Sequence, residues 1–261
     1  FNSPDEVQKA YNITYSEEEF LHPVPRTPSE NFLQDFEFSR TNFDIFSSEA
    51  SRCEAVIFPL LREACKAFVT NYSLWSHKSL AATTDPKLTG TPDYIIARRS
   101  ELGKNVLGFP LVLIAEAKQN NFTKGWGQCL AELVATQSLN AKPEQPIYGI
   151  VTDAEVWQFG KLEEKIFTKN LSRALIDDIE GAFGAVYRLL ELATEFPGKT
   201  HPRYLEFVQE LLTDDVTVTA ELADLLGSDA DAALLGQMAA LRNGQYFFAT
   251  SANLQQIYSA V

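Results

Sequence analysis

The strongest constraint on the fold is an apolar run that ends in charged residues, Leu111–Lys118. Its length, and the absence of polar side chains before Glu116, predict a β-strand that crosses a sheet buried on both faces. Alternate residues of a strand lie on the same face, so Glu116 and Lys118 project together while Ala117 points away. A buried acid and lysine at a strand end are costly without a use, which makes them candidate site residues.

A second acid, Asp93, stands between a turn signal and a strand signal. It follows Gly90–Pro92 and precedes the apolar run Tyr94–Ala97. Residues 100–105 have the composition of a hairpin connection to the strand that ends in Glu116. If the two strands pair, the carboxylates of Asp93 and Glu116 come close together.

Two such carboxylates predict a divalent-metal site for phosphodiester hydrolysis. Mg²⁺ prefers oxygen ligands and usually takes one or two carboxylates from the protein, with waters and substrate phosphate completing its shell. A neighbouring lysine can stabilise charge on phosphorus or orient the attacking water. Each residue also has a structural interpretation. Asp93 can cap the turn, and Glu116 with Lys118 can form a surface pair, although the run before them is too apolar for an exposed strand.

These residues resemble the motifs of a known nuclease superfamily. Pro92–Asp93 and Glu116–Lys118 are similar to the PD and (D/E)xK elements of the PD-(D/E)xK, or restriction-endonuclease-like, superfamily. Ser48–Ala50 followed by Ile57–Leu61 resembles the opening helix of members related to the N-terminal nuclease domain of type I restriction subunits. The resemblance covers about Phe46–Lys169.

The resemblance implies an α/β fold with an αβββαβ core, in which helices flank a mixed central sheet. It also implies a site with Mg²⁺ as cofactor and Mn²⁺ as a substitute. The implied metal ligands are Asp93, Glu116, the backbone carbonyl of Ala117 and Glu49, and Lys118 and Gln128 complete the catalytic set. Glu54 remains an alternative to Glu49, and Glu49 can instead be a first-turn acid favoured by the helix dipole. Gln128 can be an ordinary exposed helix glutamine.

The rest of the chain predicts three regions: an N-terminal arm over residues 1–45, a nuclease-like domain over 46–197, and an acidic helical extension over 203–261. Between Arg203 and Arg242 there are eight acids and no Lys or Arg, a composition that repels DNA. We expect a solvated appendage there, with a protein partner or a homo-oligomer contact as the alternative.

Periodicity and turn signals predict the elements between these boundaries. Helices are expected over 48–71, with a kink at Pro59, over 124–138 and over 173–195. Strands are expected over 72–80 and 147–151, followed by a β-hairpin that turns at Gly160-Lys161. His77 is a candidate general base, but no partner for it is identifiable in the sequence, and we treat it as structural.

The net charge of −13 argues against nucleic-acid binding, but its distribution does not. Residues 76–176 hold 12 Lys and Arg against 10 Asp and Glu, whereas the rest of the chain holds 10 against 25. The cations expected to lie around the motif and neutralise phosphates are Arg98, Arg99, Lys104 and Lys124.

Three cysteines without metal-ligand spacing fit reduced thiols and a cytoplasmic protein. The sequence contains no run of about 18 apolar residues, so no membrane span is predicted. The sequence therefore favours a Mg²⁺-dependent endonuclease, and the resemblance implies DNA rather than RNA as its substrate and a role in restriction or anti-phage defence. The alternative is a catalytically silent protein of the same fold that binds DNA or protein or acts as an assembly subunit.

Overall fold

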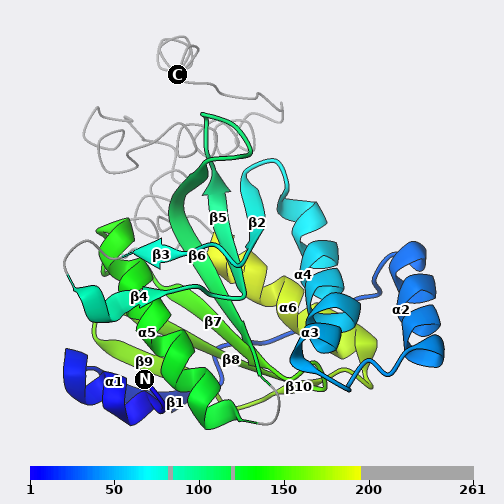
Figure 1. Ribbon diagram of the computed structural model, residues 1–261, viewed down its shortest axis with the longest axis horizontal. Coiled ribbons are helices and arrows are strands. Elements are labelled where there is room, and N and C mark those ends of the chain that lie inside the picture. Colours follow the sequence, from blue (N-terminus) through cyan, green and yellow to red (C-terminus); the bar gives the residue numbers. More distant parts are fainter. Residues whose placement is uncertain (82–84, 119–120, 195–261) are drawn as a thin grey trace, which may run out of the picture. The chain divides into compact units, whose positions relative to one another are not determined.

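An eight-stranded mixed sheet organises the part of the chain that the computed structural model describes, residues 1–81, 85–118 and 121–194 (Figure 1). The strands run in the order β1-β9-β8-β7-β6-β5-β2, with β10 paired to β8. The β6–β7 and β1–β9 pairs are parallel and the other pairs are antiparallel. The strands are β1 (Thr14–Glu18), β2 (Tyr72–Ser76), β5 (Tyr94–Arg99), β6 (Leu107–Ala117), β7 (Ile147–Thr152), β8 (Val156–Glu163), β9 (Ile166–Asn170) and β10 (Ala174–Leu175). A separate two-stranded sheet pairs β3 (Leu80–Ala81) with β4 (Thr89–Gly90).

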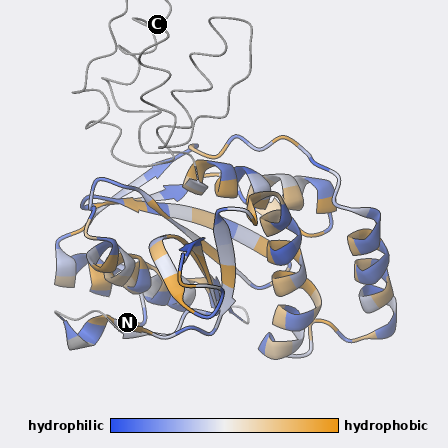
Figure 2. Cartoon of the chain, turned by 90° about the horizontal axis from the view of Figure 1, so that it is seen from above, coloured by the Kyte–Doolittle hydropathy of each residue, from blue (hydrophilic) through white to orange (hydrophobic). Residues whose placement is uncertain are grey.

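Helices cover both faces of this sheet. Two of them, α1 and α5, pack on one face, and α3, α4 and α6 pack on the other. In Figure 2 the hydrophobic residues concentrate between the helices and the sheet. The helices are α1 (Pro4–Tyr11), α2 (Glu30–Asn42), α3 (Glu49–Arg52), α4 (Phe58–Cys65), α5 (Phe122–Asn140) and α6 (Ile179–Thr194), with a π-helical turn at Cys53–Ile57 and 3₁₀ turns at Lys66–Phe68 and Pro86–Leu88. The fold is therefore α/β with a mixed, helix-flanked sheet, as the sequence predicts.

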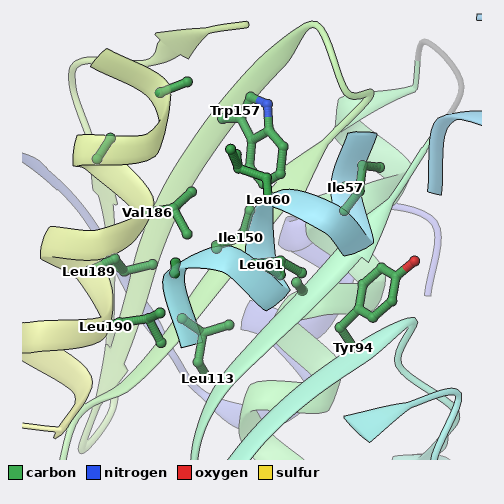
Figure 3. Close-up of a cluster of buried hydrophobic side chains, with 14 of the residues drawn as sticks. Ile57, Leu60, Leu61, Tyr94, Leu113, Ile150, Trp157, Val186, Leu189 and Leu190 are labelled. Carbon is green, nitrogen blue, oxygen red and sulfur yellow. The ribbon is translucent and has the colours of Figure 1, made fainter. Parts of the chain in front are cut away.

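The buried strands supply both layers of the core. Tyr94 and Leu113 belong to the cluster beneath α4 and α6, while Ile95 and Ile114 belong to the cluster beneath α5. Figure 3 shows the first of these clusters, where side chains from α4 and α6 meet side chains from four strands around Trp157. A strand with large apolar residues on both faces cannot lie at the protein surface, which is why the run before Glu116 fixes the centre of the sheet.

The predicted helix over 48–71 forms as α3, a π-helical turn and α4. The amide of Phe58 donates to the carbonyl of Cys53, five residues back. Pro59 follows at once and has no N–H to donate, so the wider turn accommodates the proline with little bending of the helix. The predicted kink is thus a single π-helical turn.

Two predicted boundaries are wrong. The β8–β9 hairpin turns at Glu164-Lys165 and not at Gly160-Lys161, and Gly160 lies inside β8. A Cβ on Gly160 would lie 2.9 Å from both Phe167 and Trp126, so this glycine serves close packing. The last helix begins at Ile179 and not at residue 173, because Asp178 accepts a hydrogen bond from the amide of Gly181 and caps it there.

The first 45 residues, predicted as an arm, belong to the same compact unit as the residues that follow them, and this unit extends from Phe1 to Thr194. Strand β1 extends the sheet beyond β9. Helix α1 packs against α5, where a Cβ on Gly127 would lie 2.6 Å from the backbone nitrogen of Ser3. Residues 195–197 and the predicted acidic extension over 203–261 lie outside the described residues.

Candidate functional site

The hairpin of β5 and β6 brings Asp93 and Glu116 together. Tyr94 pairs with Ala115 across the two antiparallel strands, so Asp93, just before β5, lies opposite Glu116. The carboxylate of Asp93 is fixed by the sheet itself, because its Oδ2 accepts a hydrogen bond of 2.8 Å from the amide of Ala117. The predicted hairpin and the approach of the two acids are both present.

Glu116 and Lys118 share one face of β6, and Ala117 belongs to the core cluster on the other face. The Nζ of Lys118 lies 3.0 Å from Oε2 of Glu116, and the two side chains are 14% and 3% exposed. A pair this far from water is costly to desolvate. The backbone holds it in place, since the amide of Lys118 donates to the carbonyl of Thr152 at the end of β7.

Helix α5 adds a third carboxylate that the sequence analysis did not single out. Gln128 and Glu132 are four residues apart on one face of this helix, and Glu132 is in hydrogen-bonding contact with Glu116. Gly125 begins the same face, and a Cβ there would lie 2.9 Å from Cγ of Lys118. The helix begins where it does because Asn121 accepts a hydrogen bond from the amide of Lys124 and caps it.

Burial controls the charges of this group. Removal from water raises the pKa of Glu116 and of Glu132, and the negative charge of Asp93 raises both further. Burial acts to lower the pKa of Lys118, but the hydrogen bond and attraction to Glu116, together with the charges of Asp93 and Glu49, outweigh it and raise the pKa above the ordinary value, so the ammonium stays charged. The site therefore gathers three carboxyl groups around one buried cation.

The opening helix approaches the site from the other side of the sheet. The charge of Glu49 raises the pKa of both Lys118 and the Cys53 thiol, and that of Glu54 raises the pKa of Tyr94. Both glutamates are exposed. Glu49 is therefore in electrostatic range of the site lysine, and the choice between Glu49 and Glu54 stays a prediction.

A buried arginine anchors this helix. The guanidinium of Arg52 is 6% exposed, donates to the carbonyl of Phe46 at 3.1 Å and lies 3.5 Å from the carboxylate of Glu155. It also donates to the carbonyl of Asp153 in the turn between β7 and β8. The short helix α3 is thus tied to the sheet through one cation.

His77 lies beside Asp93, a neighbour that the sequence did not reveal, and its structural role stays a prediction. Its Nδ1 lies 3.6 Å from Oδ1 of Asp93, and its amide donates to the carbonyl of Asp93 at 2.9 Å. Ser76 pairs with Tyr94 in the antiparallel β2–β5 ladder, so the next residue, His77, lies opposite Asp93. Since 62% of the side chain is exposed, His77 lies at the solvent side of the acids.

The four predicted phosphate-binding cations do not gather at the acids. Arg98 and Arg99 are exposed at the far end of β5, and at about 3.3 Å per residue this places them on the order of 17 to 20 Å from Asp93. Lys104 lies in the hairpin turn beyond them. Only Lys124, in the first turn of α5, lies beside the site.

The carboxylate and amide oxygens of the site are the ligand type that a hard cation prefers, although the side chains are not arranged as a complete coordination shell. Among residues 1–81, 85–118 and 121–194, no group of three or more His, Cys, Asp or Glu side chains is arranged to hold a metal ion. Two buried oxygens, Oε1 of Gln128 and Oε2 of Glu132, receive no hydrogen bond from an N–H or hydroxyl group of that region. Buried acceptors without donors are rare, and an oxygen-binding cation satisfies them.

Searches against known proteins found no matching family model and no matching curated protein. None of the helices among the described residues is long and apolar enough to cross a membrane.

Proposed function

We propose that this chain is a metal-dependent nuclease that hydrolyses phosphodiester bonds, with DNA favoured over RNA. One observation supports the proposal most: Asp93, Glu116 and Lys118 come from neighbouring strands to one buried place. A protein gains no stability from burying such a group in preference to apolar side chains, so a use in binding or catalysis explains it better.

The order of elements supports the same proposal. Helices α3 and α4, strands β2, β5 and β6, helix α5 and strand β7 follow one another as helix, three strands, helix and strand, with β6 and β7 parallel. Apart from the separate β3–β4 pair between β2 and β5, this order is consistent with the αβββαβ core that the resemblance to the PD-(D/E)xK superfamily implies, and it supports the proposal. A fold hosts many functions, so the chemistry of the site carries the argument.

The site residues divide the work of hydrolysis between them. Asp93 and Glu116, with the carbonyl of Ala117, would hold the Mg²⁺ ion. The bound ion would lower the pKa of a water molecule and offset charge on the scissile phosphate. Lys118, held by Glu116, places a fixed positive charge where a phosphate oxygen or the attacking water is oriented. Gln128 offers an amide nearly two turns from the start of α5, and Lys124 offers a second cation for the substrate backbone.

The test is cleavage of single- and double-stranded DNA and RNA by the purified protein with Mg²⁺ or Mn²⁺. We expect Asp93→Asn to abolish cleavage, while Glu144→Gln, which removes an exposed acid from the loop before β7, leaves it unchanged. Lack of cleavage of any of these substrates by the wild-type protein, with either metal, would contradict the proposal. A role in restriction or anti-phage defence is a further part of it, tested by phage plating on cells that express the wild type or Asp93→Asn.

A catalytically silent DNA- or protein-binding member of the same fold is the second candidate. The net charge of −13 and the position of Arg98 and Arg99 far from the acids favour it. The two candidates differ in their response to metal. A silent protein binds its partner equally well as wild type and as Asp93→Asn, with or without Mg²⁺.

A further inference from the structure

Glu132 is held inside the site by two structural features that the proposed nuclease chemistry does not explain. It is 7% exposed, in the middle of the buried face of α5. Space for it exists because residue 90 is glycine: a Cβ there would lie 2.9 Å from Oε1 and 3.2 Å from Cγ of Glu132. The segment that leads into Asp93 is thus shaped around this carboxylate.

The charges around Glu132 do not balance. Asp93, Glu116 and Glu132 influence one another electrostatically, and the buried cation among them is the single ammonium of Lys118, which already pairs with Glu116. Like charges at close range in a poorly hydrated site repel strongly.

Two acceptors on the same helix face lack donors. Oε2 of Glu132 and Oε1 of Gln128 are both buried, and neither receives a hydrogen bond from the described residues. Because the two residues are four positions apart on α5, both oxygens lie on the side of the helix that faces Glu116. Buried oxygen atoms without donors are the ligand type that a hard divalent cation selects.

We propose that Glu132 is a ligand of the divalent cation, supplied by α5, so that the acids of the site are Asp93, Glu116 and Glu132, with the Gln128 amide oxygen beside them. This inference rests on the proposed metal-dependent function. It assigns to Glu132 the role that the resemblance gives to Glu49, which is exposed on a helix of four residues.

The experiment measures Mn²⁺ affinity by isothermal titration calorimetry on the full-length wild type, Glu132→Gln, Asp93→Asn and Glu49→Gln. The control Glu144→Gln removes the same charge from an exposed position. We expect Glu132→Gln to weaken Mn²⁺ binding at least about tenfold, as Asp93→Asn does, and Glu49→Gln and Glu144→Gln to change it less than about twofold. The thermal midpoint of the metal-free Glu132→Gln protein should equal or exceed that of the wild type, while its rise on addition of Mn²⁺ should be lost.

A merely structural Glu132 predicts a different result. In that case Glu132→Gln changes the thermal midpoint but binds Mn²⁺ within twofold of the wild type, which overturns the inference while leaving the nuclease proposal intact. The reverse case is also distinguishable: if Glu132→Gln and Asp93→Asn both lose Mn²⁺ but the loaded wild type cuts no nucleic acid, the ligand assignment stands and the nuclease proposal fails. Should Glu132→Gln not fold, Glu132→Asp keeps the charge and shortens the reach. Wild-type affinity in that variant would contradict the assignment.

Discussion

The two ends of the β5–β6 hairpin differ in how far their charged side chains are exposed to water. At one end, Asp93, Glu116 and Lys118 are largely withdrawn from water; Lys118 pairs with Glu116, and Asp93 accepts a hydrogen bond from the amide between them. At the other end, Arg98 and Arg99 are exposed and close to solvent. Buried charges cost free energy that only specific partners offset, whereas exposed charges cost little. The buried end is therefore informative about function, and the exposed end is not.

Removing the buried cation should have the largest effect. Lys118→Met leaves Glu116 buried without its partner, and we expect the free energy of unfolding at pH 8 to fall by about 3 kcal/mol. The loss should shrink at pH 5, because a protonated Glu116 no longer needs the ammonium. Urea unfolding of the wild type and Lys118→Met at both pH values measures this loss in the free energy of unfolding. The matched variant at the exposed end, Lys104→Met, should change the free energy of unfolding by less than about 0.5 kcal/mol. Equal losses in the two variants would show that burial of the charge does not distinguish the two ends of the hairpin.

The pH dependence of stability is the next largest effect. Burial raises the pKa of Glu132 in the folded protein, so folding favours its protonated form. Its contribution is full below the ordinary glutamate value and is lost as pH rises toward the raised pKa. In the absence of divalent metal, we expect the free energy of unfolding to fall by about 2 kcal/mol between pH 5 and pH 8, and Glu132→Gln to flatten this slope. A slope that persists in Glu132→Gln but disappears in Glu144→Gln would contradict this origin.

Two glycines allow a smaller test of the same contrast. Alanine in place of a helical glycine normally stabilises by about 1 kcal/mol, but Gly125→Ala should destabilise by about 1 to 2 kcal/mol. Its Cβ would lie 2.6 Å from Val151 and 2.9 Å from Lys118, which must move. At the other end Gly103 has a φ of 108°, so Gly103→Ala should cost about 1 kcal/mol through backbone strain.

Activity separates these two glycine variants. Gly125→Ala displaces the site lysine and should reduce Mg²⁺-dependent cleavage at a temperature where both variants are folded. Gly103→Ala should cleave at the wild-type rate under the same conditions. Equal activity of the two variants would show that the position of Lys118 is not limiting.

The smallest effect is expected for the surface cations. Lys124→Ala should weaken DNA binding. The slope of the logarithm of the binding constant against the logarithm of the salt concentration should fall in magnitude by about 1, as for the loss of one phosphate contact. Lys104→Ala should leave both unchanged, because the hairpin turn lies at the far end of β5 from the acids. Fluorescence anisotropy at several salt concentrations compares them. A larger loss in Lys104→Ala would show that DNA follows the exposed end instead.

The sequence predicts the parts of this site that depend on strand geometry. A two-residue period places Glu116 and Lys118 on one face, and an apolar run on both faces fixes a central strand. Contacts between elements far apart in the sequence are not encoded in any local pattern. Glu132 could have been suspected, since it interrupts the apolar face of α5 four residues after Gln128, but only the packing of α5 on β6 brings it to Glu116.

The missed neighbour of His77 and the wrong predictions have the same origin. The neighbour of His77, Asp93, is set by the register of β2 against β5, which no local pattern in the sequence indicates. Gly160 is a turn signal by composition, but it serves the packing of Trp126 and Phe167 against β8. Arg98, Arg99 and Lys104 are near the motif in sequence but far from it in space, because the extended strand β5 separates them from Asp93.

The π-helical turn before α4 contains one residue more than an α-helix needs. This extra residue sets the rotation of α3 about the helix axis relative to α4. Each α-helical residue advances the helix by about 100°. Deleting one residue from Cys53–Ile57 would let the helix run on continuously, but it would rotate α3 by about that angle. Arg52 would then turn away from the carbonyls of Phe46 and Asp153, and Glu49 would leave the vicinity of Lys118. A single inserted residue thus determines which side of the opening helix faces the acids.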